Sequence, residues 1–126
     1  MTKERAATLT ASVGAGLLFL TAGVHFQAYS YIVSQAPTAL QPLMAALWVF
    51  VGISLVIAAF LAISVTPLFI VRRRALLGIA ALIPLSTAIL QIVYLGFMAP
   101  TSLLLLDAGV LLLAGELGRA YQSRPR

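Results

Sequence analysis

Residues 46–65 read ALWVFVGISLVIAAFLAISV, a stretch without a single charged side chain. It belongs to a longer run, from Ala6 to Val71, that contains no Lys, Arg, Asp or Glu, and a second such run extends from Ala75 to Leu106. A helix needs about 20 predominantly apolar residues to cross the hydrocarbon core of a bilayer. The first run therefore has room for two membrane-spanning helices, and the second, continued past Asp107, has room for two more.

The composition excludes a water-soluble fold. Of the 126 residues, 62% are hydrophobic and only 9% are charged, whereas about a quarter of the residues in a soluble domain are charged. We predict one all-α domain over residues 1–126, a polytopic membrane protein with spans at about residues 7–33, 41–65, 75–98 and 100–118. Short loops make neighbouring helices antiparallel, so the expected assembly is an up-down-up-down bundle.

Prolines and small residues add local detail. Pro37 and Thr66-Pro67 are expected to end helices, and Pro84 is expected to kink the third span. Small residues four positions apart, such as Ser12 with Gly16 and Ala58 with Ala62, would permit close helix contacts.

The basic residues define an orientation. They lie before the first span, between the second and third, and after the fourth, which is the same side of the membrane in a four-span topology. The eight residues are Lys3, Arg5, Arg72, Arg73, Arg74, Arg119, Arg124 and Arg126. The positive-inside rule places both termini and the middle basic loop in the cytoplasm, and membrane lipids are the expected partners of these cations. The first apolar stretch exceeds the core of a signal peptide and is interpreted as a retained span. A net charge of +5 distributed in this way does not indicate nucleic-acid binding.

Several kinds of chemistry are excluded or disfavoured by residue type. The chain has no cysteine, so disulfide exchange, thiolate metal sites and iron–sulfur clusters are excluded. One histidine per chain cannot provide two axial haem ligands. His25 and Asp107 lack a third protein ligand, so no metal site is predicted. No cofactor is indicated.

Four polar or ionisable side chains within the predicted spans need a partner or a function, because such groups are costly in hydrocarbon. They are His25, Gln91, Asp107 and Glu116. Glu116 precedes Arg119 by three residues, a spacing that favours an interfacial ion pair. Asp107 and Glu116 differ by nine positions, about half a turn in phase, so an inward Asp107 implies an outward Glu116.

The other three side chains have matching depths. His25, Gln91 and Asp107 each lie seven or eight residues from an uncharged outer loop, which places them roughly 10–12 Å below the outer surface at about 1.5 Å per residue. Trp48 has the same depth on the second span. We therefore expect one polar layer to which all four helices contribute.

Helical spacing indicates which faces point inward. One stripe on the first span comprises Thr21, His25 and Tyr29, and another on the third comprises Pro84, Thr87, Gln91 and Tyr94. Two interpretations stay open. In one, His25 pairs with Asp107 and the layer only fixes helix register. In the other, the layer is the floor of a pocket in which a His25–Asp107 pair moves a proton, while Trp48, Gln91, Tyr29, Tyr94 and Thr87 bind a small hydrophobic molecule.

The segments Ala22-Gly23-Val24-His25-Phe26 and Trp48-Val49-Phe50-Val51-Gly52 resemble the DoxX-like group of small four-helix bacterial membrane proteins. The resemblance covers mainly the first half of the chain, and the glutamate of the second helix in that group is replaced here by apolar residues near Ser54. It implies a protein of the bacterial inner membrane, in some relatives an accessory subunit in quinone-linked oxidation.

Two other classes are compatible with the sequence. The length and span count are similar to those of small multidrug exporters, although the essential glutamate of their first helix is absent here. An assembly subunit without a site of its own is the third class, and a homo-oligomer or a partner membrane subunit would suit it. Our prediction is a binding protein, or an acid–base enzyme, for a small lipophilic molecule in the outer leaflet.

Overall fold

The computed structural model describes residues 3–65, 70–97 and 99–119, and these residues are almost entirely helical. The elements are α1 (Lys3–Gln27), α2 (Tyr29–Gln35), the short 3-10 helix η1 (Thr38–Leu40), α3 (Gln41–Ser64), α4 (Ile70–Leu95) and α5 (Ala99–Arg119). Four helical stretches are long and apolar enough to cross a membrane: Arg5–Gln27, Thr38–Ser64, Arg72–Leu95 and Ala99–Leu117. The prediction of an all-α, multi-pass membrane protein is confirmed.

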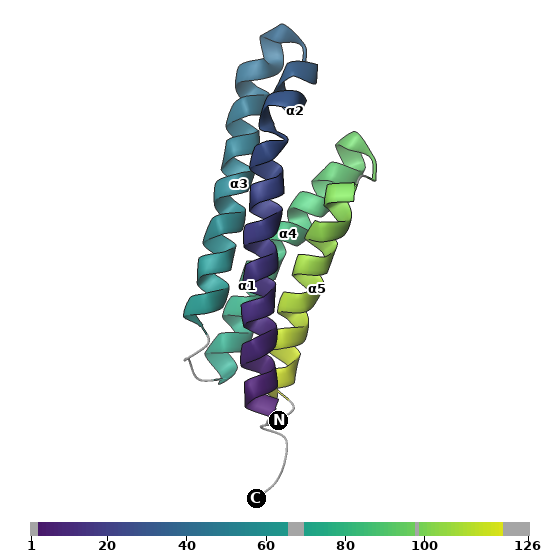
Figure 1. Cartoon of the computed structure of the whole chain (residues 1–126). Helices are drawn as coiled ribbons and strands as arrows, with labels where there is room; N and C mark the ends of the chain where they lie inside the picture. Colours follow the sequence, from purple (N-terminus) through teal and green to yellow (C-terminus); the bar gives the residue numbers. More distant parts are fainter. Residues whose placement is uncertain (1–2, 66–69, 98, 120–126) are drawn as a thin grey trace, which may run out of the picture.

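The helices form a four-cornered bundle in which α1 packs against α3 and α5, and α4 packs against α5 and α3. The start of α1 and the end of α5 lie at the same end of the bundle (Figure 1). At the other end α1, α2 and α3 continue beyond the hairpin of α4 and α5, which leans away from them. Of the neighbouring pairs of long helices, α3 and α4 pack least extensively, so the bundle is loosest between these two helices.

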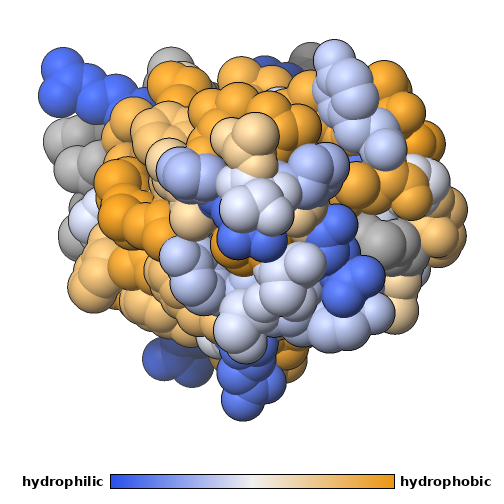
Figure 2. All heavy atoms as spheres, turned by 90° about the horizontal axis from the view of Figure 1, so that it is seen from above, coloured by the Kyte–Doolittle hydropathy of each residue, from blue (hydrophilic) through white to orange (hydrophobic). Residues whose placement is uncertain are grey.

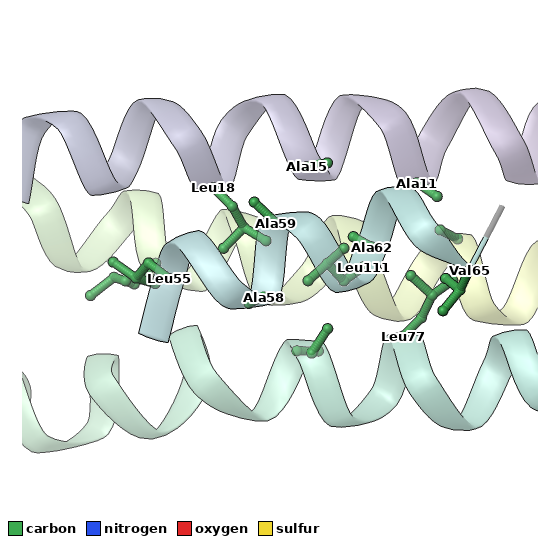
Figure 3. Close-up of a cluster of buried hydrophobic side chains, with 14 of the residues drawn as sticks. Ala11, Ala15, Leu18, Leu55, Ala58, Ala59, Ala62, Val65, Leu77 and Leu111 are labelled. Carbon is green, nitrogen blue, oxygen red and sulfur yellow. The ribbon is translucent and has the colours of Figure 1, made fainter. Parts of the chain in front are cut away.

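Small side chains form the core along most of its length. In Figure 3, Ala11 and Ala15 of α1 face the alanines of α3, and the cluster of buried residues is dominated by Ala and Leu. Lipid tails are as apolar as leucine, so burial in a membrane supplies little hydrophobic drive. Close approach of the helix backbones, which alanine permits, is therefore the main source of packing energy.

The predicted small-residue contacts are partly right. Ala58 and Ala62 are fully buried. Ser12 and Gly16 are exposed, because the buried positions on α1 are Ala11 and Ala15, one residue earlier in each case. Each of these alanines is followed directly by another small residue, Ser12 or Gly16. The sequence therefore does not show which of the two small pairs faces the core.

The outside of the bundle matches a lipid environment. Large apolar side chains such as Phe50, Phe60 and Val93 are 61–68% exposed. Figure 2 looks down on the end formed by α2 and the start of α3, where neutral polar side chains gather in the middle of a hydrophobic rim. This end carries Ser34, Gln35, Thr38 and Gln41 and no charged residue.

The basic end differs from the prediction in two respects. Helix α4 begins at Ile70, so Arg72, Arg73 and Arg74 lie in its first turns rather than in a loop, and Arg73 is buried. Glu116 is exposed, as expected from the inward Asp107. Glu116 forms an ion pair with Arg74 of α4, with 2.7 Å between Arg74 Nη2 and Glu116 Oε1. The side chain of Arg119, its predicted partner, and the Thr66-Pro67 segment lie outside the described residues.

Glycine and proline have different effects on the length of α4. Helix α4 ends at Leu95, and Gly96 adopts a φ of 79°, the left-handed conformation in which glycine ends helices. Pro84 lies inside α4 without ending it. The predicted kink at Pro84 stays a prediction.

The bundle yields a test of orientation in this cysteine-free chain. Thr38→Cys and Ala99→Cys, both exposed at the uncharged end, should react with a membrane-impermeant maleimide added to intact cells, because the positive-inside rule predicts that the basic end faces the cytoplasm. Ser64→Cys, exposed at the basic end, should react only after the membrane is permeabilised. The reverse pattern would overturn the orientation, and labelling of all three in intact cells would indicate insertion in both directions.

Candidate functional site

His25 and Trp48 join α1 to α3 through two reciprocal hydrogen bonds. The His25 Nε2–H donates to the Trp48 carbonyl at 2.7 Å, and the Trp48 indole N–H donates to the His25 carbonyl, also at 2.7 Å. The two rings stack, with centroids 4.1 Å apart and planes 7° from parallel. A carbonyl oxygen can only accept, so the proton of a neutral His25 is on Nε2 and Nδ1 is left as an acceptor.

The indole of Trp48 accounts for the end of α1. The backbone hydrogen bonds across this point run from Ala28 N–H to Val24 O and from Ile32 N–H to Ala28 O. Within the described chain the His25 carbonyl is not bonded by Tyr29, and it accepts the Trp48 indole instead. A side chain that captures a carbonyl of the helical ladder breaks or bends the helix. The predicted span at 7–33 is thus divided at Ala28 into α1 and α2.

A steric contact lies one residue beyond this hydrogen-bonded pair on α1. Gly52, one turn after Trp48, faces the ring of Phe26, and a Cβ built on Gly52 would lie 2.6 Å from Phe26 Cζ. A side chain at Gly52 would force the Phe26 ring to move. Phe26 and Gly52 thus fix the register of α1 on α3.

A groove of about 460 Å³ lies between α3 and α4, where the bundle is loosest. Its wall is almost wholly apolar, apart from a few side chains with hydrogen-bonding groups. The lining residues are His25, Met44, Leu47, Trp48, Val51, Thr87, Leu90, Gln91, Tyr94 and Leu95.

A second, smaller cavity of about 90 Å³ lies on the other side of the same residues. It shares His25, Trp48 and Gln91 with the groove and otherwise lies between α1 and α5. Its remaining lining residues are Thr21, Val24, Ala28, Ile32, Pro100, Leu103 and Leu104. His25, Trp48 and Gln91 therefore form a partition between two spaces.

Gln91 is held by a residue that sequence reasoning missed. Thr101 is fully buried at the start of α5, and its hydroxyl donates to the Gln91 side-chain oxygen at 3.0 Å. The amide nitrogen of Gln91 makes no hydrogen bond within the described residues. The sequence analysis placed Thr101 at the start of the fourth span, one residue after Pro100, but gave it no role in the polar layer.

Asp107 is buried, with 1% of its surface exposed, but it is not in contact with His25. The side chain near it is Thr21 of α1, one helical turn, about 6 Å, toward the basic end from His25. Among the described residues, neither Asp107 Oδ2 nor Thr21 Oγ1 has a hydrogen-bond partner. The expected direct His25–Asp107 pair is therefore wrong, because the imidazole Nε2–H is taken by Trp48 and Asp107 lies deeper.

The other expected site residues divide into two groups. His25, Trp48 and Gln91 are buried and adjacent, as the layer predicted, while Thr87 and Tyr94 line the groove with them. Tyr29 lines neither cavity. The roles assigned to these residues in binding or catalysis stay predictions.

The chemistry available here is hydrogen bonding and stacking. Within residues 3–65, 70–97 and 99–119, no three His, Asp or Glu side chains come together as metal ligands would. The groove has an aromatic face, a carboxamide and hydroxyl groups on an apolar wall. Such a surface suits a neutral, lipid-soluble molecule with one polar end.

The origin of the helix break can be tested with Trp48→Phe, which keeps an aromatic ring but removes the indole N–H. The freed His25 carbonyl should then accept the Tyr29 amide, so hydrogen exchange of that amide should slow by about tenfold, the effect of one added hydrogen bond. Hydrogen exchange read by mass spectrometry measures this, with the lipid-facing Phe50→Leu as control. Unchanged or faster exchange would show that the indole does not cause the break.

The contact between Phe26 and Gly52 predicts a contrast between two glycines. Gly52→Ala should destabilise the protein by about 1–3 kcal/mol, because an added methyl group overpacks a filled space. Gly23→Ala, where no atom lies within 4 Å of the new Cβ, should be neutral or stabilising by up to about 1 kcal/mol. Thermal unfolding in detergent measures both. The double variant Phe26→Leu/Gly52→Ala should recover stability, and equal effects of the two glycine changes would contradict the contact.

No family model, curated protein or solved structure matches this chain.

Proposed function

We propose that this multi-pass membrane protein binds a small lipophilic molecule from the leaflet at its uncharged end, in the groove between α3 and α4. The observation that carries the proposal is the groove itself. Its volume of about 460 Å³ lies in the range of roughly 300–1,000 Å³ that is usual for small-molecule sites. A ligand dissolved in the bilayer would enter between the two helices that pack least extensively.

The wall of the groove supports a ligand with one polar end. Gln91 is buried, and its amide nitrogen makes no hydrogen bond within the described residues, so it would serve a polar group of the ligand. Trp48 and Tyr94 supply aromatic surface, and Met44 and Leu47 supply aliphatic surface. The polar end of a ligand would thus lie beside Gln91 and its chain among the apolar side chains.

The function proposed is binding rather than catalysis by a direct His–Asp pair. His25 donates to the Trp48 carbonyl and holds two helices together, so its first role is to shape the wall. The resemblance to DoxX-like proteins makes a quinone the first ligand to test, and a bacterial inner membrane with the basic end in the cytoplasm the proposed location.

Trp48 is the only tryptophan of the chain and lines the groove, so its fluorescence reports on this site alone. We expect a short-chain benzoquinone, titrated into protein in lipid nanodiscs, to quench Trp48 in a saturable manner. Gln91→Leu should weaken the saturable component by about tenfold, the effect of one lost hydrogen bond. Gln27→Leu, exposed and outside the groove, should bind like the wild type.

Quenching that rises in proportion to the quinone concentration without saturation would mean simple partitioning into lipid. That result, or identical saturable binding by Gln91→Leu, would contradict the proposal for quinones at this groove. A screen of other lipid-soluble compounds without any saturable quenching would leave the accessory subunit as the better interpretation.

A further inference from the structure

The Thr21 hydroxyl differs from those of Thr10 and Thr87, two other threonines within helices. Thr10 donates to the carbonyl of Ala6 at 2.8 Å, and Thr87 donates to that of Ile83 at 2.9 Å. This bond to the preceding turn is the usual way in which a threonine satisfies its hydroxyl inside a helix. The Thr21 hydroxyl is buried and makes no such bond. Its orientation leaves it available to another partner.

That partner has room in the smaller cavity, which Thr21 lines together with His25 and Gln91. A volume of about 90 Å³ accommodates about three water molecules at roughly 30 Å³ each. A buried water needs two to four polar partners. His25 Nδ1 and the Gln91 amide supply two, and the Thr21 side chain lines the wall beside them.

Asp107 lies just beyond the inner end of this cavity. It follows the lining residue Leu104 by three positions, and Thr21 stands beside it on α1. Among side chains that the structure describes, the titratable groups on the packed elements are His25 and Arg5 on α1, Tyr94 and the three arginines on α4, and Glu116 on α5 itself. Of these only His25 borders the smaller cavity, and Arg74 is paired with Glu116.

A charged carboxylate at this position would be costly. Asp107 Oδ2 is buried without a hydrogen bond, and the described residues form no ion pair with it. An unpaired charge in hydrocarbon costs several kcal/mol, and taking up a proton removes that cost. The cavity and the Thr21 hydroxyl offer a path by which a proton would arrive.

We propose that the smaller cavity holds water and that Asp107 is a proton-binding site, which exchanges its proton with that water through the Thr21 hydroxyl. In the transfer, Thr21 Oγ1 accepts a proton from a hydronium ion in the cavity, which is left as water, and gives its own proton to Asp107 Oδ2, so the hydroxyl is restored. Release runs in reverse. The site is independent of the proposed groove ligand, although His25 and Gln91 border both spaces.

Infrared spectroscopy of the protein in nanodiscs tests this without any added ligand. A protonated carboxyl gives a C=O band above the amide bands, and the band shifts when its proton is replaced by deuterium. We expect such a band at mildly acidic pH in the wild type and its loss in Asp107→Asn. In D₂O the shift should be at least about tenfold slower in Thr21→Val, which removes only the hydroxyl on the path.

Controls separate the path from a general effect on folding. Thr10→Val makes the same substitution on the same helix, outside the cavity, and should exchange like the wild type, as should Thr21→Ser, which keeps the hydroxyl. Ala28→Leu fills the cavity and should slow the shift as Thr21→Val does.

The absence of an Asp107 band would overturn the proton site. Unaltered exchange in Thr21→Val, or in Ala28→Leu, would overturn the path. A failure of quinone binding at the groove leaves all of these measurements unchanged, so the two proposals fail separately.

Discussion

The structure depends on two reciprocal hydrogen bonds, each from a side chain to a backbone carbonyl, within the membrane-spanning part of the bundle. Every backbone carbonyl in hydrocarbon needs a donor, and the helical ladder normally provides it. At His25 the donor is the indole of Trp48, on a different helix. This bond, with its counterpart from the imidazole, ends α1, stacks the two rings and builds the partition between groove and cavity.

The fold was largely accessible from the sequence because hydrophobicity and length alone select membrane-spanning helices. Burial of His25, Trp48, Gln91 and Asp107 was also accessible, since polar side chains in spans turn toward other helices. The pairing of these residues was not. Depth counted from the loops has an error of about one turn, and one turn decides whether Asp107 meets His25 or Thr21.

The helix break at Ala28 had no signal in the local sequence. No proline or glycine lies at that position, and the cause is a side chain 20 residues away in the chain. The Phe26–Gly52 contact also had no local signal. It depends on how α1 and α3 are rotated about their axes, and the many small residues of these helices do not determine that rotation. The two segments that carry the family resemblance are those that meet in these contacts, so the motif can be understood as a packing device as well as a site.

The polar contacts are distributed over the bundle in a way that bears on its biogenesis. His25 and Trp48 lie within the first hairpin, while Gln91 with Thr101 and Arg74 with Glu116 lie within the second. These contacts can therefore form within each hairpin separately. Those of the first hairpin can form before the second has been synthesised. Thr21 and Asp107 belong to different hairpins, so docking of the hairpins brings together a polar pair that neither half contains.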